Sequence, residues 1–253
     1  MREISGVVIT RNEEDRIALC LNAMGKVCTE VIVVDTDSED QTTQIARTMG
    51  ARVHAAQWLG FGQTKNLGAD IATYNWILSI DADEVLSDEL VQTLNKLELR
   101  EDQVYALDRI SNLCGKWIHH SGWYPDWIPR LYHRKKVSWD HAHVHEQLVI
   151  PHGCQVEKLN GKLFHYSYQT FEQFDEKMER YARLSARSML EKGRPYNPLL
   201  ARVSPAFRYF RTLVLKMGFL DGQEGLWLSR KNAELVHKKY EYLRKLIEAA
   251  DEM

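Results

Sequence analysis

The sequence predicts an α/β fold in which a Rossmann-like, mostly parallel central sheet is flanked by helices and followed by a helical C-terminal extension. Short apolar, β-branched runs alternate with amphipathic helical patterns over residues 1–100. That order is typical of a parallel sheet wound with right-handed crossovers. After Thr170 the chain reads as helical almost to its end. We therefore expect an α/β domain over residues 1–168 and a helical extension over residues 169–253.

Composition places the chain among ordinary globular proteins. Its 253 residues suffice for one sizeable α/β domain with an appendage, and they are 44% hydrophobic and 27% charged. The four cysteines show no Cys-x-x-Cys spacing, so we expect free thiols in a reducing compartment. No signal peptide is visible, nor any apolar run near the roughly 20 residues of a membrane span. A cytoplasmic location is therefore expected.

Four strands separated by helices are expected in the first part of the chain. The apolar runs that predict them cover residues 4–10, 30–35, 51–55 and 75–84. Asn12 is placed to cap the first helix, and Ser38 with Gln41 has capping-box spacing for the second. A loop through Gly60 and Gly62 leads into the third helix.

The pattern changes after residue 103 to short strands and clustered aromatic residues. Asn160-Gly161 is a dipeptide typical of tight turns and predicts a hairpin at that point. Thr170 with Gln173 predicts a capped helix at the start of the extension. The extension is expected to break at residues 194–198 and 218–225.

The most informative stretch is Asp81-Ala82-Asp83-Glu84, where the fourth apolar run ends in three acids within four residues. Ligands of open α/β sheets bind outside the carboxyl ends of the strands, so these acids are expected in a crevice. Two hard oxygen donors close together suit Mg²⁺ or Mn²⁺, particularly a metal shared with substrate phosphates. The alternative is an acidic loop in which Asp83 or Ser87 only caps the following helix.

Two further sites border the same predicted crevice. Asp35 and Asp37 follow the second strand, where a carboxylate can accept from a base N–H or a ribose hydroxyl. Lys65 follows the Gly-x-Gly loop, and its ammonium could approach a diphosphate. Without a third glycine or a Gly-Lys-Ser/Thr sequence, neither a dinucleotide fingerprint nor a P-loop is expected. A solvated lysine at a helix start is the alternative for Lys65.

Three successive motifs in this half of the chain resemble the signatures of family 2 glycosyltransferases with the GT-A fold. They are Val7-Val8-Ile9-Thr10-Arg11-Asn12-Glu13-Glu14, Val33-Val34-Asp35-Thr36-Asp37-Ser38-Glu39-Asp40-Gln41-Thr42 and Asp81-Ala82-Asp83-Glu84.

The family resemblance implies a nucleotide-sugar donor and assigns residues to it. Thr10, Asn12, Asp35 and Asp37 would hold the nucleoside, and Asp81 and Asp83 the diphosphate through Mg²⁺ or Mn²⁺. Many members carry a second Asp where this chain has Thr36, so which acid contacts the base stays open.

Later motifs resemble the subgroup of heptose β-1,4-glucosyltransferases of lipopolysaccharide inner-core assembly. They are Trp58-Leu59-Gly60-Phe61-Gly62-Gln63-Thr64-Lys65-Asn66, Gly122-Trp123-Tyr124-Pro125-Asp126, Arg130-Leu131-Tyr132, His145-Glu146 and Gly161-Lys162-Leu163-Phe164-His165-Tyr166. The resemblance implies inverting transfer of a hexose from UDP-glucose or a similar UDP-hexose to a membrane-held core saccharide. Residues 1–100 would form the nucleotide-sugar-binding half and residues 101–168 the acceptor half.

Inverting transfer requires a base that takes the proton of the acceptor hydroxyl. Glu146, which follows the basic, aromatic strand as in the family, is our first candidate, and Asp126 is the second. Asp140 is expected to be a structural loop acid that pairs with a neighbouring cation.

An aromatic cluster at Trp117, Trp123, Tyr124 and Trp127 fits an acceptor platform on which sugar rings stack. Trp123, Tyr124 and Arg130 are the acceptor residues that we expect, and core packing is the alternative for at least one tryptophan. The alternating His141, His143 and His145 resemble a zinc site, but without a cysteine at supporting spacing zinc is not expected. One of them, or His165, could still complete the metal shell or stabilise the departing diphosphate.

A basic segment with interleaved apolar residues lies in the extension, with Arg202, Arg208, Arg211 and Lys216 among Phe207, Phe210 and Val214. It fits peripheral contact with the cytoplasmic face of the inner membrane. The alternative is a helix packed on the catalytic domain with a solvated basic edge. Nucleic acid is not expected, because no recognised binding module accompanies these cations.

The main alternative to an enzyme is a non-catalytic nucleotide-sugar or glycolipid binding protein on the same fold. A glycosidase with paired carboxylates, which would need neither metal nor nucleotide, is a third possibility.

Overall fold

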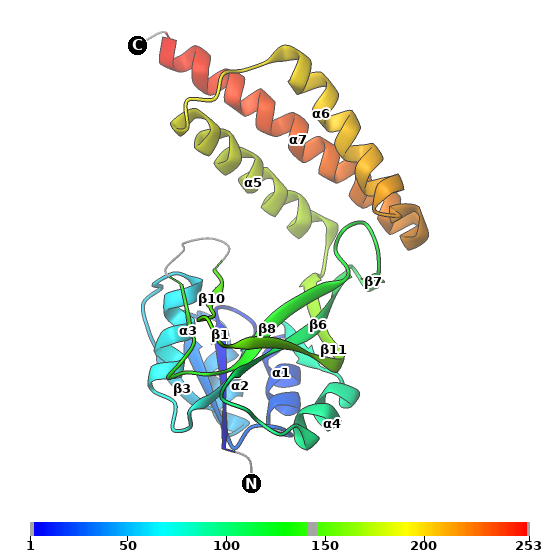
Figure 1. Ribbon diagram of the computed structural model, residues 1–253. Helices are drawn as coiled ribbons and strands as arrows, with labels where there is room; N and C mark the ends of the chain where they lie inside the picture. Colours follow the sequence, from blue (N-terminus) through cyan, green and yellow to red (C-terminus); the bar gives the residue numbers. More distant parts are fainter. Residues whose placement is uncertain (1–2, 141–145, 252–253) are drawn as a thin grey trace. The chain divides into compact units, whose positions relative to one another are not determined.

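The computed structural model describes residues 3–140 and 146–251 of the chain. Internal contacts divide the chain into two compact units, drawn in Figure 1. The α/β unit comprises residues 1–109 and 126–165, and the helical unit comprises residues 110–125 and 166–253. Residues 110–125 thus belong to the helical unit, although they lie within the range 1–168 that we expected to form the α/β domain.

One half of the central sheet is parallel, as predicted. Its strands are β3 (Arg52–Ala55), β2 (Glu30–Asp35), β1 (Ile4–Thr10) and β4 (Trp76–Asp81), hydrogen-bonded in that order. In the register, Thr10 pairs with Asp35 and Ile9 with Asp81. The carboxyl ends of three neighbouring strands therefore meet at one edge of the sheet.

The other half extends the sheet with antiparallel strands. They are β8 (Asp126–His133), β6 (Gln103–Leu113), β11 (Gln155–Tyr168) and β5 (Glu84–Leu86), and β7 (Lys116–Ile118) pairs with β6. A separate ribbon joins β9 (Ser138–Trp139) to β10 (Leu148–Val149). The α/β class is confirmed.

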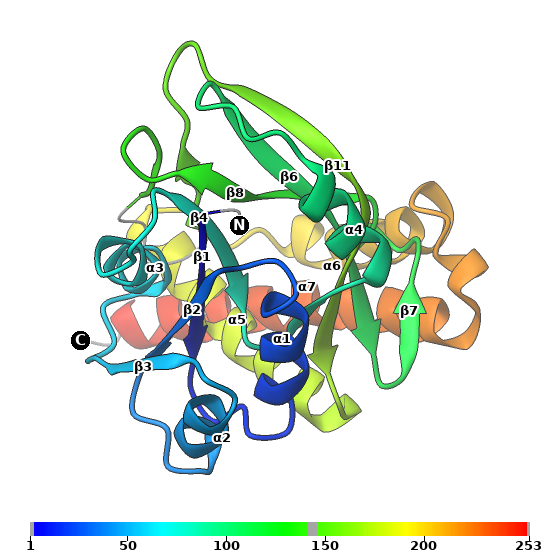
Figure 2. The same cartoon turned by 90° about the horizontal axis from the view of Figure 1, so that it is seen from below.

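Helices cover both faces of the parallel strands, and Figure 2 shows α1 and α3 on opposite sides of β1. The helices of this unit are α1 (Ile17–Met24), α2 (Thr42–Thr48), α3 (Phe61–Asp70) and α4 (Asp88–Lys96). Along β1, Ile4 and Val8 belong to the core beneath α1 and α4, whereas Val7 and Ile9 belong to the core beneath α3. This period of two is expected for a strand buried on both faces.

Two predicted helix caps are wrong. The side-chain oxygen of Asn12 accepts from the backbone N–H of Glu39, and the hydroxyl of Ser38 accepts from the N–H of Asn12. These polar groups join the β1 and β2 loops to each other, and α1 and α2 have no side-chain cap bond. The caps at Ser87 and Thr170 are confirmed, the latter as a full capping box with Gln173.

The hairpin predicted at Asn160-Gly161 is also wrong, because β11 runs through both residues without a turn. Gly161 has φ +100°, and a Cβ there would lie 2.3 Å from the backbone nitrogen of Leu90. The glycine is needed for close approach of β11 to the first turn of α4, a tertiary contact that a local pattern does not reveal.

The helical unit is built on α7 (Gly222–Asp251), against which α5 (Phe171–Glu191) and α6 (Pro198–Phe210) both pack (Figure 1). A π-helical turn, η1 (Arg211–Leu215), and a 3₁₀ turn, η2 (Gly218–Asp221), connect α6 to α7. The carboxylate of Asp221 accepts from the backbone N–H groups of His119 and His120. No helix in the described part of the chain is long and apolar enough to cross a membrane.

Candidate active site

The edge where β1, β2 and β4 end carries polar atoms without partners. Thr10 Oγ1 and Asp35 Oδ1 are buried, and neither has a hydrogen-bond partner among the described residues. Asp35 is anchored through its other oxygen, which accepts from the backbone N–H of Ser38 at 3.1 Å. Buried polar atoms are rarely left unsatisfied, so this edge is suited to a ligand with its own donors and acceptors.

The loops after β1 and β2 are held in unusual conformations. Asn12 and Asp37 both have positive φ, 54° and 60°. Asn12 is occupied by its bonds to the neighbouring loop, whereas Asp37 is exposed. Of the residues expected to hold a nucleoside, Thr10 and Asp35 therefore each have a side-chain oxygen that makes no hydrogen bond to a described residue and could bind it. The side chain of Asn12 instead holds the conformation of the neighbouring loop.

Lys65 is buried in the α/β unit, with 1% of its surface exposed. Its Nζ lies 2.9 Å from Glu146 Oε1, 3.1 Å from Asp81 Oδ1 and 4.6 Å from the ring centroid of Trp139. Lys65 is therefore not a solvated lysine at a helix start. It joins the acid at the end of β4 to the first candidate base.

Gly62 explains how α3 brings Lys65 to this place. A Cβ on Gly62 would lie 2.3 Å from the carbonyl oxygen of Asp140. The glycine therefore lets the start of α3 lie against the segment after β9. In addition, the side chain of Asn66 exchanges hydrogen bonds with the backbone N–H and carbonyl of Trp139. The Gly-x-Gly loop thus serves close helix packing in this structure.

A second cation, Arg130, joins Asp81 to Glu84. Its NH2 group lies 2.6 Å from Asp81 Oδ2 and 2.8 Å from Glu84 Oε1. Glu84 is fully buried, and its Oε2 accepts from the backbone N–H of Asp81 at 3.0 Å. Burial alone would raise the pKa of Asp81, but Arg130 and Lys65 together hold it well below its usual range.

Arg109 continues the same network to the second candidate base. It lies 3.2 Å from Glu84 and 2.7 Å from Asp126. Seven side chains of alternating charge are thereby linked in the order Asp126, Arg109, Glu84, Arg130, Asp81, Lys65 and Glu146. The roles of Glu84 and Arg109 were missed by sequence reasoning. Glu84 belongs to the acidic run at residues 81–84, which could have indicated its role. The residues next to Arg109 in the sequence form no motif that would indicate a functional role.

Asp83 lies apart from this network and pairs with His165 of β11, its carboxylate 3.2 Å from Nε2. Since Ser87 caps α4, capping does not account for Asp83. Burial opposes ionisation of Asp83, yet the charge interaction and hydrogen bond with His165 outweigh it and lower the pKa of this carboxyl. Burial and the charge of Asp83 raise the pKa of nearby Glu13 to about 7. Glu13 therefore adds a second carboxyl near Asp83.

A divalent metal fits Asp83 better than Asp81. Asp83, in the turn between β4 and β5, and His165 of β11 can supply one oxygen and one nitrogen, whereas both oxygens of Asp81 already lie against Lys65 or Arg130. Across residues 3–140 and 146–251, no group of three or more His, Cys, Asp and Glu could hold a metal alone. Mg²⁺ or Mn²⁺ would therefore need substrate oxygens and water in its remaining positions, as is usual for metals shared with phosphates.

A pocket of about 570 Å³ opens beside the charge network. Its lining includes Asp81, Asp126, Arg130 and Trp139 from strands β4, β8 and β9, and Glu146 from the segment before β10. Both candidate bases therefore face one cavity. Arg130 Nε is buried without a hydrogen-bond partner among the described residues, so it can donate to a ligand in or beside the pocket.

The remaining predicted residues lie elsewhere. Trp123 and Tyr124 belong to the helical unit, where Trp123 contacts Tyr168 and Phe174. Core packing, the alternative considered for one tryptophan, thus accounts for at least part of the surface of Trp123. The three alternating histidines, 141, 143 and 145, lie outside the described residues.

Comparison with known proteins gives one family. The sequence model described as "Glycosyl transferase family 2" matches residues 5–150. An uncharacterized glycosyltransferase of Rickettsia typhi is 28% identical over 236 residues, which are 89% of this chain and 81% of that protein. The lipopolysaccharide core biosynthesis glycosyltransferase LpsC of Rhizobium meliloti is 23% identical over 256 residues, covering 94% and 93% of the two chains.

Similar solved structures include S. aureus TarS 1–349 in complex with UDP-GlcNAc, with a TM-score of 0.46 and 15% identity over 96% of this chain and 92% of that one. Glucosyl-3-phosphoglycerate synthase from Mycobacterium tuberculosis, crystallised with Mn²⁺, UDP and glucosyl-3-phosphoglycerate, has a TM-score of 0.34 and 23% identity. That similarity covers 44% of each chain.

Proposed function

The chain belongs to glycosyl transferase family 2, and we propose that it is an inverting, metal-dependent hexosyltransferase. The donor is a UDP-sugar, with UDP-glucose our first choice, and the acceptor is a sugar of the lipopolysaccharide core or a related surface glycan. The observation that carries this proposal is the pocket where two candidate bases meet the acid at the end of β4. Similarity to the Rhizobium core-biosynthesis enzyme over nearly the full length supports the acceptor class.

The donor site lies at the sheet edge and extends from the nucleoside to the diphosphate. The unpartnered atoms of Thr10 and Asp35 suit the N–H and hydroxyl groups of uridine, and Asp37 lies on the same loop. Lys65 and Arg130 provide positive charge beside the diphosphate position. Asp83 and His165 would hold Mg²⁺ or Mn²⁺. When bound, the ion would neutralise the charge that develops on the departing diphosphate.

One carboxylate in the pocket takes the proton from the acceptor hydroxyl as the sugar is transferred. Glu146 is the first choice and Asp126 the second, and in each the bond to a cation involves one oxygen, Oε1 to Lys65 and Oδ2 to Arg109. A base must lie on the face of the sugar opposite the leaving diphosphate. Arg130 binds a hydroxyl through its unpartnered Nε.

Two matched substitutions identify the base. We expect Glu146→Gln to lower kcat roughly 10²- to 10⁴-fold, the usual contribution of a general base, and Asp126→Asn to lower it less. Neither change should alter UDP affinity in Mn²⁺ more than about twofold, because neither residue contacts the nucleotide in this assignment. The reverse ranking of the two kcat losses would make Asp126 the base.

The donor and metal are tested by thermal shift with UDP-, GDP- and dTDP-sugars, each with and without Mn²⁺. We expect the largest stabilisation from a UDP-sugar with Mn²⁺, and we expect Asp83→Asn to remove the effect of Mn²⁺ while leaving metal-free UDP binding. Release of UDP in the presence of a core saccharide then measures transfer. Binding without turnover on any donor would favour a nucleotide-sugar binding protein and contradict the enzymatic proposal.

We also propose that the chain works as a peripheral protein at the cytoplasmic face of the inner membrane. This location would bring it to an acceptor that is held by lipid.

A further inference from the structure

Helix α6 presents its large apolar side chains to solvent. None of its residues, all of which the structure describes, is buried. Leu200, Val203, Phe207 and Phe210 follow one another at intervals of three or four residues, and 48–56% of the surface of each is exposed. This spacing places them on one face of the helix. An apolar helix face normally points into a core, so the orientation of α6 requires another explanation.

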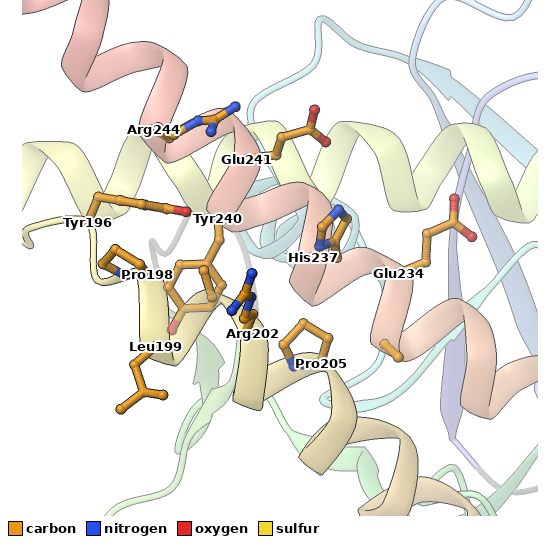
Figure 3. A pocket seen from close by; sticks show the side chains of 12 residues that line it. Tyr196, Pro198, Leu199, Arg202, Pro205, Glu234, His237, Tyr240, Glu241 and Arg244 are labelled. Atoms are coloured by element: carbon orange, nitrogen blue, oxygen red, sulfur yellow. The ribbon is translucent and has the colours of Figure 1, made fainter.

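The opposite side of α6 attaches the helix to α7. Figure 3 shows Arg202 of α6 and His237 and Tyr240 of α7 in the space between the two helices. This groove has a volume of about 970 Å³, and its charged side chains, Arg202, Glu234, Glu241 and Arg244, carry both signs. The residues of α6 that line this groove include Ala201, Arg202 and Pro205, whereas Leu200, Val203, Phe207 and Phe210 do not line it and stay exposed. Because its charges balance, the groove itself does not select an anionic or cationic ligand.

Further exposed apolar side chains follow α6 in the sequence, in and between η1 and η2. Val214, Leu215, Met217, Phe219 and Leu220 are 44–59% exposed. Residues 192–220 also contain six cations and no acid, namely Lys192, Arg194, Arg202, Arg208, Arg211 and Lys216. The segment therefore combines many exposed apolar side chains with cations and no acid in its sequence, the two features of a helix that lies in a membrane interface.

We propose that residues 198–220, here called the interfacial segment, bind the surface of a bilayer that contains anionic phospholipids. The apolar side chains enter the region between head groups and acyl chains, and the surrounding Arg and Lys contact the phosphates. α6 has 13 residues and is about 20 Å long at 1.5 Å per residue, too short to cross a hydrocarbon core of about 30 Å. It must therefore lie along the surface.

A bilayer fits this surface better than a second copy of the chain. In a two-fold dimer, the same patch of each protomer would face its counterpart, bringing two sets of like charges together. Anionic lipid head groups instead complement the exposed cations that lie outside the groove, such as Arg211 and Lys216. The inference goes beyond the proposed catalysis, since lipid binding depends neither on the donor nor on the metal.

The test uses the full chain in a flotation assay with vesicles of phosphatidylcholine alone or of phosphatidylcholine mixed with phosphatidylglycerol. We expect binding to the mixed vesicles, little binding to phosphatidylcholine alone, and weaker binding as salt is raised. The double variant Phe207→Ser/Phe210→Ser should lower affinity about tenfold or more, because two large apolar groups no longer enter the interface. Arg211→Glu/Lys216→Glu should do the same by removing charge attraction.

The matched controls are Leu184→Ser and Arg187→Glu on α5, an exposed leucine and an exposed arginine of the same unit. These variants should bind like the wild type, and far-ultraviolet circular dichroism should show that every variant is folded. Equal binding of all variants would overturn the proposal, as would equal binding to both vesicle types. A solution dimer that dissociates in the phenylalanine variant would assign the surface to a second copy and equally overturn it.

Discussion

At the scale of single residues, Glu84 is the group on which the site's charges depend. It has no exposed surface, yet it contacts Arg109, Arg130 and the backbone N–H of Asp81. A buried carboxylate is stable only with such partners, and the partners in turn need its charge. Glu84 therefore fixes the distance between the two arginines and the conformation of the chain at Asp81.

We expect Glu84→Gln to lower the free energy of unfolding by roughly 3 kcal/mol, because removing one partner leaves two guanidinium groups with too little compensating charge. Urea denaturation measures the change. Glu89→Gln, at an exposed position on α4, should change stability by less than about 0.5 kcal/mol. If the two variants lost equal stability, Glu84 would not have the organising role described here.

The sequence located the acids of the site better than the cations that hold them. Asp35, Asp81 and Asp83 follow strands whose apolar patterns are clear, so their common edge could be deduced from the rules for parallel sheets. Arg109 lies within an unremarkable strand and meets Glu84 only through antiparallel pairing in the other half of the sheet. Arg109 and Glu84 are 25 residues apart in the sequence, and the hydrophobic pattern around either residue does not predict their contact.

At the scale of elements, Gly161 shows how one residue lets β11 approach α4. We expect Gly161→Ala to destabilise the protein by about 3 kcal/mol or more, since a Cβ would both overlap the backbone of Leu90 and require a positive φ. Gly153→Ala is a close control, because Gly153 has the same φ of +100° and nothing within 4 Å of the added Cβ.

Gly153→Ala should lower the free energy of unfolding only by the cost of a positive φ in alanine, about 1–2 kcal/mol. Thermal unfolding of both proteins measures the difference. Similar losses in the two variants would mean that close packing against α4 contributes little, and that the positive φ alone explains the glycine.

Glu179 of α5 connects two helices of the helical unit. It lies 3.0 Å from Lys238 of α7 and also contacts Tyr242 and Arg183. The hydrogen bonds from Tyr242 and Lys238 lower the pKa of Glu179 to about 2. Because this folded-state pKa is below the unfolded value of about 4.3, the ionised group stabilises the fold above that pH. The contribution disappears as pH falls toward about 2.

Glu179→Gln should therefore cost about 1 kcal/mol at pH 7, an amount that allows for the partial exposure of the side chain. The difference from wild type should shrink as pH falls below about 5. Chemical denaturation at a series of pH values measures it. The same substitution at Glu176, exposed on the same helix, should change stability by less than about 0.5 kcal/mol at pH 7. A constant difference for Glu179→Gln would contradict the ion pairing.

Strands and helix caps were predicted correctly where the sequence pattern is local. They were predicted wrongly where a polar side chain can bond to more than one backbone group. The Thr170 cap and the parallel strands depend on neighbours in sequence, and both are present. Asn12 and Ser38 have side chains suited to helix caps, but they bond to each other's loops 26 residues apart. Propensity alone does not decide between two such partners.

At the scale of the whole molecule, the chain consists of an α/β unit, most of which the family model matches, and a helical unit that carries the interfacial segment. The family model covers residues 5–150, whereas the interfacial segment lies outside that range. Residues 110–125 enter the helical unit partly through Asp221, whose bond to the N–H of His119 spans 102 residues of sequence. The division of the chain therefore follows long-range contacts and could not be deduced from the order of its elements.

If both proposals hold, lipid binding and catalysis should be separable in one variant. We expect Phe207→Ser/Phe210→Ser to transfer sugar to a water-soluble core saccharide within about twofold of wild type, because neither residue lines the pocket at Asp81 and Glu146. Transfer to the same saccharide on a lipid in anionic vesicles should fall about tenfold or more, since the enzyme no longer gains a high effective concentration at the surface. Initial rates of UDP release with the two acceptors measure this ratio. An equal fall with both acceptors would mean that the interfacial segment supports the active site itself, and an equal rate with both would mean that the acceptor reaches the pocket without it.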